Sequence, residues 1–291
     1  MSYLAQVTTG GAQTGQRIVI AGVEKVGKTT LASAAPGALL IPLEQGSATV
    51  PVPKVPMLHT FEEIEAFCLE VRAAAIAGKV PRGSTLVWDS GTALERAIED
   101  YTLRCDPDWS KKGGKGITMI SAHGGYGKAF EVARQTFDRW LRYQDELAFN
   151  AGINIIITCH VFASRVVDPA HGEYDTWDLL LHSPKNNKTY GIREYLTQWA
   201  DLIGFLHEPM FVMKAAQGEN LNKATSTNQG RVIAVDRQPA WVAGNRYGLS
   251  GAIAIPPSKP GELAVDSWNA IANQIWISTG NRIDLWNRSK I

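Results

Sequence analysis

The segment from Gly22 to Thr30 constrains the fold of this chain more than any other feature of its sequence. It reads G-V-E-K-V-G-K-T-T, which fits the pattern G-x-x-x-x-G-K-[ST] of phosphate-binding loops in full. The apolar run 17–22 predicts a buried strand before the loop, and the residues from Lys28 onward predict a helix that ends before Pro36. A strand, a glycine-rich loop and a helix in this order are typical of an α/β fold that binds nucleotide phosphates.

Each conserved position of that pattern has a chemical reason. Glycines let the backbone curl so that successive N–H groups point at a phosphate, and the N-terminus of the next helix adds a partial positive charge. We expect Lys28 to neutralise the β- and γ-phosphates of ATP and the Thr29 hydroxyl to complete the shell of a Mg²⁺ ion. The predicted nucleotide-binding residues are Gly22, Val23, Glu24, Lys25, Val26, Gly27, Lys28, Thr29 and Thr30.

Three more polar residues lie at the ends of apolar runs that predict buried strands. Glu44 ends ALLIPLE, Asp89 lies near the end of STLVWDS, and His160 ends INIIITCH. Ligands of open α/β sheets bind at the carboxyl ends of the strands. We therefore expect Asp89 to hold Mg²⁺ through water, Glu44 to activate the attacking water, and His160 to hydrogen-bond the γ-phosphate. The alternatives are a helix N-cap, a solvated loop acid and a structural histidine, respectively.

The rest of the chain predicts an α/β fold with a mostly parallel central sheet, helices on both faces and an antiparallel extension at its C-terminal side. A turn at 168–172 predicts a β-hairpin, and residues 106–127 are predicted to form a long loop. Apolar periodicity predicts helices over 61–79, 91–104, 128–152 and 264–276, and late strands over 199–206, 211–216 and 231–237. These late strands are expected to extend the sheet in antiparallel fashion.

The composition of the chain limits the binding partners and the cellular compartment that can be expected for it. The formal net charge of the 291 residues is +1, so a nucleic-acid-binding surface has to be local. The three cysteines are widely spaced, which is typical of reduced thiols and a cytoplasmic protein. The N-terminal residues lack a secretory pattern, and no apolar run approaches the ~20 residues of a membrane span, so no membrane partner is expected.

With these residues identified, the chain resembles the RecA family of recombinases. It is most similar to the small phage-type RecA-like ATPases of the single-strand annealing group, and it shares features with RadA. Glu24 and Thr30 give the loop the RecA form G-x-E-x-x-G-K-T-T. The resemblance implies a RecA-like P-loop NTPase core in which Glu44 is catalytic, Asp89 holds magnesium and His160 is the γ-phosphate switch.

The run A-G-N-R-Y-G-L over 243–249 is similar to a segment that, in RecA and RadA, reaches the nucleotide of a neighbouring subunit. Gly244 stands where those relatives have a lysine, so Arg246 is the residue that could deliver charge in trans. This implies self-association into a filament or ring with ATP at the protomer interface. The expected organisation is a flexible arm over 1–16, the RecA-like ATPase domain over 17–255, and a C-terminal segment with one helix over 256–291.

The resemblance also implies two DNA-binding loops, at about 106–127 and 161–190. Lysines would neutralise DNA phosphates and aromatic side chains would stack on bases. Because the second segment also carries acids, a solvated surface loop is the alternative for both. The candidate DNA contacts are Lys111, Lys112, Lys115, Phe162, Arg165, Lys185 and Lys188.

The function that these features favour is ATP-dependent binding of single-stranded DNA in annealing, homologous recombination and repair, with a single-strand DNA-binding protein as a candidate partner. The first alternative is a P-loop ATPase switch or loader that acts on a protein partner in replication or repair. The second is a nucleotide kinase. A kinase predicts an arginine-rich lid over the phosphates, whereas the arginines of this chain are scattered.

Overall fold

The computed structural model describes residues 14–170, 172–184, 190–213, 223–226, 230–259 and 261–285. Four strands that run parallel to one another form the centre of the fold, and their side chains are almost all buried, as expected for a sheet covered on both faces. They are β1 (Arg17–Ala21), β2 (Ala38–Pro42), β3 (Thr85–Asp89) and β4 (Asn154–Cys159).

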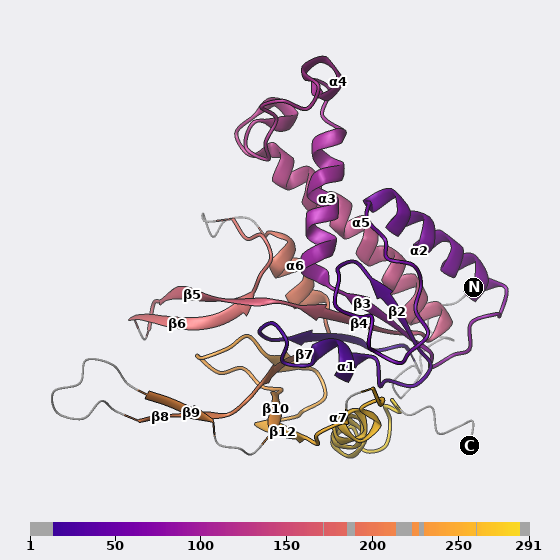
Figure 1. The fold of residues 1–291 in the computed structure, drawn as a ribbon, viewed down its shortest axis with the longest axis vertical. Helices are drawn as coiled ribbons and strands as arrows, with labels where there is room; N and C mark the ends of the chain where they lie inside the picture. The colour runs from indigo at the N-terminus through magenta and orange to yellow at the C-terminus, as the bar shows by residue number, and fades with distance from the viewer. Residues whose placement is uncertain are drawn as a thin grey trace, which may run out of the picture.

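The sheet continues beyond β1 into the second half of the chain. Its described strands follow the order β12-β10-β7-β1-β4-β3-β2, and β11 also pairs with β7 (Figure 1). Strand β10 runs antiparallel to β7 and β12, so the predicted fold class with an antiparallel extension is confirmed. The added strands are β7 (Leu202–His207), β10 (Arg231–Ala234), β11 (Gly244–Asn245) and β12 (Ala252–Ile255).

Two details of the predicted extension are wrong. Strand β7 is parallel to β1, because a helix that the sequence analysis missed, α6 (Ile192–Trp199), supplies the crossover that a parallel connection needs. The predicted strand over 211–216 does not join the central sheet. Instead β8 (Met210–Met213) pairs with β9 (Lys223–Ser226) in a separate hairpin, and residues 214–216 lie outside the described residues.

Helices cover both faces of the sheet (Figure 1). The helices α2 (Phe61–Ile76), α3 (Gly91–Arg104), α5 (Lys128–Ala151) and α6 pack in one hydrophobic core, and α1 (Lys28–Ala32) and α7 (Val265–Ser278) pack in the other. Trp88 and Trp140 are fully buried in the first core, with ring centroids 5.1 Å apart, and Trp268 is buried in the second. The C-terminal helix α7 thus shares a core with the sheet.

Local signals explain where the helices begin and end. The Thr60 side chain accepts a hydrogen bond from the Glu63 N–H, and the Glu63 side chain accepts one from the Thr60 N–H, which fixes the start of α2. Ser90 caps α3 in the same way through the Ala93 N–H. Gly152, with a φ of 66°, ends α5 in the left-handed conformation that favours glycine.

Residues 106–127 and the hairpin that follows β4 are among the described segments that project from this body. Residues 106–127, predicted to be a loop, contain two helical turns, α4 (Trp109–Lys112) and η2 (Ala122–Gly124), at the far end of α3 and α5 (Figure 1). The predicted hairpin is confirmed: β5 (Val161–Asp168) pairs antiparallel with β6 (Gly172–Leu179).

The last residues of the predicted arm attach to the sheet. The Gln16 N–H donates to Asn154 Oδ1 at 2.9 Å, and Tyr247 Oη donates to Gln16 Oε1 at 2.8 Å. Residues 1–13 of that arm lie outside the described residues. None of the helices in the described part of the chain has the length and apolar character that crossing a membrane requires.

Candidate nucleotide site

The loop after β1 has the geometry that its glycines predict. Gly27 has a φ of 98° and begins α1, and a Cβ atom there would meet the Arg231 guanidinium. Gly22 packs so closely that a Cβ atom would lie 2.6 Å from the carbonyl oxygen of Leu206. A side chain at either position would therefore displace the loop. Of the other loop residues, Val26 is buried, Thr30 is half-buried, and Val23, Glu24 and Lys25 are exposed.

Lys28 lies inside the curl of this loop. Its Nζ donates to the carbonyl oxygens of Gly22 at 2.9 Å and Val23 at 2.8 Å. Burial lowers the pKa of Lys28, against the opposing attraction of nearby carboxylates, of which Asp89 acts most strongly. The ammonium group is thus held by the loop backbone that is expected to surround the phosphates.

Asp89 and Thr29 meet at the carboxyl end of β3. Thr29 Oγ1 donates to Asp89 Oδ2 at 3.0 Å, and Thr158 on β4 donates to the other carboxylate oxygen. Burial raises the pKa of Asp89, although both of these hydrogen bonds oppose the shift. A hydroxyl beside a carboxylate is the hard oxygen pair that Mg²⁺ prefers, so these residues fit the predicted metal. Ser90, not Asp89, caps α3, so the alternative role of Asp89 as N-cap is wrong.

Glu44 and His160, predicted separately, form one hydrogen-bonded pair. His160 Nε2 lies 2.9 Å from Glu44 Oε1, across the ends of β2 and β4. Burial would raise the pKa of Glu44, but hydrogen bonds with His160 and Ser90 outweigh it, so the pKa is lowered and the carboxylate is ionised at neutral pH. His160 Nδ1 is buried and has no hydrogen-bond partner among the described residues. The pair therefore offers a base and a ring nitrogen at the same edge of the sheet as the loop.

Two contacts of this site were missed by the sequence analysis. Thr158, which holds Asp89, lies inside an apolar run that carries no sign of a functional hydroxyl. Arg231 Nη1 donates to the carbonyl oxygen of Val26 at 3.1 Å, so a guanidinium lies against the phosphate loop. Arg231 is more than 200 positions from the loop in sequence, and only the pairing of β10 with β7 reveals it.

Arg246 does not reach this site within its own chain. Its guanidinium donates to Asp201 Oδ1 at 2.8 Å and to the Gln198 carbonyl oxygen at 2.6 Å. Asp201 directly precedes β7, so the pair lies at the amino end of the parallel strands, and the loop lies at the carboxyl end. A role of Arg246 toward a neighbour's nucleotide stays a prediction about an assembly.

The candidate DNA contacts are dispersed, and several are already paired. Asp108 lies 3.3 Å from Lys111 and 3.4 Å from Lys112, and Arg165 lies 3.5 Å from Asp175 and 3.6 Å from Glu173. Lys115 is exposed on the projection and Phe162 is half-buried in β5. Lys185 and Lys188 lie outside the described residues. These ion pairs are all on exposed side chains, where such pairs contribute little and can exchange for DNA phosphates.

A comparison with family models identifies a related domain. A family model described as an AAA domain matches residues 14–247, which is most of the chain and includes every strand from β1 to β11. No curated protein matches the chain. The matched region contains the phosphate loop and all three strand-end residues, Glu44, Asp89 and His160.

Proposed function

This chain belongs to the family of AAA domains, and from that premise we propose that it is an ATPase that binds single-stranded DNA and promotes annealing or homologous recombination. The proposal has two parts with separate support. The chemistry rests on the residues gathered around the phosphate loop. The DNA substrate rests on an aromatic surface at the start of α5, and on the resemblance of the sequence to RecA-like annealing ATPases.

For the chemistry, Lys28 and the loop N–H groups bind the ATP phosphates, and Thr29 and Asp89 hold Mg²⁺. When bound, the ion neutralises charge on the phosphate oxygens. Glu44, ionised at neutral pH, orients the attacking water and accepts its proton. Arg231, already against the loop, adds positive charge in the same chain.

For the DNA substrate, the strongest support comes from two exposed tyrosines beside one pocket. The pocket has a volume of about 420 Å³ and lies where the start of α5 meets His182, Pro184, Tyr190 and Gly191. Tyr126 is 98% exposed and Tyr190 is 59% exposed. Exposed rings next to a groove are what sequence-tolerant stacking on unpaired bases requires.

The backbone holds Tyr126 outward. Its φ of 55° is unusual for a residue with a side chain, and the adjacent Gly127 N–H donates to the Ile120 carbonyl oxygen at 3.0 Å. The exposed Lys128 lines the same pocket and forms no ion pair with any carboxylate of the described residues, so it can neutralise a DNA phosphate. Phe130 and His182, which also line the pocket, stack on each other with ring centroids 4.0 Å apart.

The nucleotide site is connected to this surface through the chain itself. His160 is the residue between β4 and β5. Strand β5 begins the hairpin with β6, and the chain after this hairpin leads to His182. A change in the contact between His160 and Glu44 on nucleotide binding would therefore act first on that hairpin. We propose this as the route by which ATP controls DNA binding, with protomers assembled into a filament or ring.

The test compares ATP hydrolysis and DNA affinity in tyrosine variants. Poly-dT should stimulate hydrolysis by the wild-type protein. Tyr126→Ala combined with Tyr190→Ala should weaken poly-dT binding at least ~10-fold, because each stack contributes about 1–3 kcal/mol. The matched control, Tyr126→Phe with Tyr190→Phe, keeps both rings and should bind as the wild type does. Hydrolysis that no polynucleotide stimulates, or unchanged affinity in the alanine variant, would refute the DNA proposal.

A further inference from the structure

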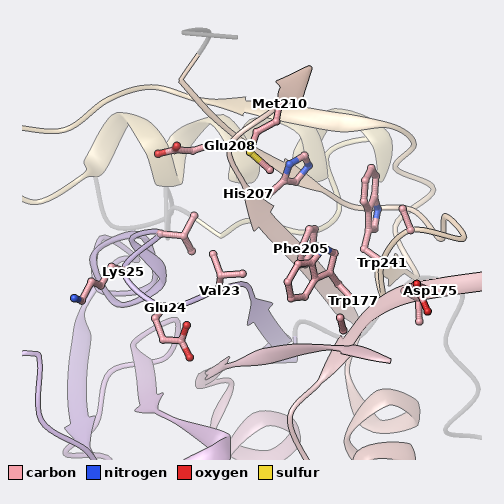
Figure 2. Close-up of a pocket in the computed structure, with 14 residues that line it drawn as sticks. Val23, Glu24, Lys25, Asp175, Trp177, Phe205, His207, Glu208, Met210 and Trp241 are labelled. Atoms are coloured by element: carbon pink, nitrogen blue, oxygen red, sulfur yellow. The ribbon is translucent and has the colours of Figure 1, made fainter. Parts of the chain in front are cut away.

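A second pocket lies on the outer side of the phosphate loop, with a volume of about 620 Å³. Figure 2 shows Val23, Glu24 and Lys25 of the loop on one side of it and an aromatic group on the other. The aromatic group consists of Trp177 on β6, Phe205 and His207 on β7, and Trp241. Neither the proposed ATP chemistry nor the proposed DNA surface uses this pocket.

The aromatic wall is ordered by stacking and by the backbone. Phe205 stacks on Trp241 at 5.7 Å between centroids and on His207 at 5.2 Å. The Trp177 N–H donates to the Ala240 carbonyl oxygen at 2.9 Å, and the Val242 N–H donates to the Trp177 carbonyl oxygen at 2.8 Å. These bonds fasten the segment that carries Trp241 to the β5–β6 hairpin, so the wall is formed before any ligand arrives.

Two buried nitrogen atoms of this wall have no hydrogen-bond partner among the residues that the structure describes. They are Trp241 Nε1, which can only donate, and His207 Nε2. Burial lowers the pKa of His207, although a backbone hydrogen bond with Glu208 opposes the shift, so the ring is neutral at neutral pH. Leaving such groups unpaired costs about 1–3 kcal/mol each. Because both atoms are inaccessible, a ligand in this pocket meets the apolar surface of the rings and not these two nitrogens.

The charge of the lining residues distinguishes between the classes of ligand that could bind in this pocket. The carboxylates of Glu24, Asp175 and Glu208 line the pocket together with a single lysine, Lys25, and Arg165 approaches Asp175 to 3.5 Å. The surroundings thus remain acidic, and nucleotide phosphates bound in the loop would add negative charge. The negative charge around the pocket would repel the phosphates of a nucleic-acid strand, whereas it would attract a cationic ligand.

We propose that this pocket binds a segment of a partner protein in which an aromatic or aliphatic side chain stands next to lysine or arginine. The apolar side chain lies on the aromatic wall. The basic residue pairs with Glu208 and Asp175 at the rim. Glu208 and Asp175 are both exposed, so they are accessible to such a residue.

The position of the pocket couples this partner to the nucleotide. Its loop-side wall, from Val23 to Val26, belongs to the loop whose backbone is proposed to bind the phosphates. By reciprocity, a nucleotide that tightens the binding of the segment is itself bound more tightly when the segment is present. This coupling rests on the proposed nucleotide site, but it does not depend on single-stranded DNA being the substrate.

The experiment uses the full chain and fluorescent peptides of about twelve residues, matched except for the charges beside a central phenylalanine. Anisotropy should show that the Lys-Phe-Lys peptide binds at least ~10-fold more tightly than the Glu-Phe-Glu peptide. Trp241→Ala should weaken its binding at least ~10-fold, as expected for a buried aromatic contact. A non-hydrolysable ATP analogue should lower the dissociation constant of the Lys-Phe-Lys peptide.

A second variant separates loss of the site from loss of the fold. Glu208→Lys changes an exposed carboxylate and should reverse the preference between the two peptides, whereas Glu70→Lys, on the exposed face of α2, should not. Equal binding of both peptides, or no binding of either, would overturn the proposal. It would also be overturned if Trp241→Ala abolished binding of a labelled dT oligonucleotide and left peptide binding unchanged, because the pocket would then be a nucleobase site. Failure of poly-dT to stimulate hydrolysis would leave these outcomes unaffected.

Discussion

The buried carboxyl of Glu95 on α3 supports a prediction about pH and stability. Burial raises its pKa from an ordinary 4.5 to about 7, although a hydrogen bond from the His182 N–H opposes the shift. That bond, 2.7 Å long, ties the segment after β6 to α3, and His182 also lines the pocket proposed to bind DNA. The proton that Glu95 keeps near neutral pH is therefore linked to the stability of the fold.

The sign follows from proton binding in the two states. Between pH 4.5 and 7 the folded protein keeps a proton on Glu95 that the unfolded chain releases, so stability falls as the pH rises through this window and then levels off. The full effect is at most about 3 kcal/mol. Glu95→Gln keeps an acceptor for the His182 N–H and removes the titration. Relative to the wild type, the variant should thus gain about 2–3 kcal/mol between pH 5 and pH 8.

Thermal unfolding of both proteins from pH 5 to pH 8, at matched ionic strength, measures this gain. The difference in Tm should widen by about 5 °C over that range, in favour of the variant. Other titrating groups are common to both proteins and cancel in the difference. Glu70→Gln, at an exposed position on α2, is the control and should follow the wild type at every pH. A constant difference between Glu95→Gln and wild type would refute the reasoning.

Three further predictions concern the nucleotide site. Glu44→Gln should retain ATP binding and reduce the hydrolysis rate by about 10²–10⁴-fold, the range of a lost general base; an unchanged rate would remove Glu44 from the mechanism. Thr158→Val removes a hydrogen bond to Asp89 and should raise the Mg²⁺ concentration needed for half-maximal hydrolysis by about 10-fold or more, which a magnesium titration measures. Arg246→Ala mixed with Lys28→Ala should recover part of the activity that each lacks alone, if Arg246 acts on a neighbour's nucleotide; a mixture as inactive as its components would argue against that role.

The phosphate loop and the parallel strands could be predicted from the sequence because their signals are local. The order strand, loop and helix around Lys28 is contained in one short segment, and Glu44, Asp89 and His160 each directly follow an apolar run. Parallel strands bring such ends to one edge, so their proximity followed from the fold class alone. The hydrogen bond between Glu44 and His160 was beyond that reasoning, because it depends on rotamers and on the sheet order.

What the sequence could not reveal depends on long-range packing. In the sequence, Thr158 cannot be distinguished from other β-branched core residues. Its hydroxyl can donate to Asp89 only because β4 pairs with β3. The helical spacing of Ile192, Leu196 and Trp199 was hidden because its last residue also begins the apolar run of β7. That one missed helix reversed the predicted direction of a strand, since the crossover decides between parallel and antiparallel pairing.

The rate of ATP hydrolysis by Lys28→Ala tests the central claim, that the loop from Gly22 to Thr30 binds ATP for hydrolysis, most directly. Lys79→Ala, which changes an exposed lysine after α2, is the matched control. The wild type and the control should hydrolyse ATP at the same rate, and Lys28→Ala should be slower by at least ~100-fold, because its ammonium is the charge that the loop presents to the phosphates. Hydrolysis by Lys28→Ala at the wild-type rate would contradict the account.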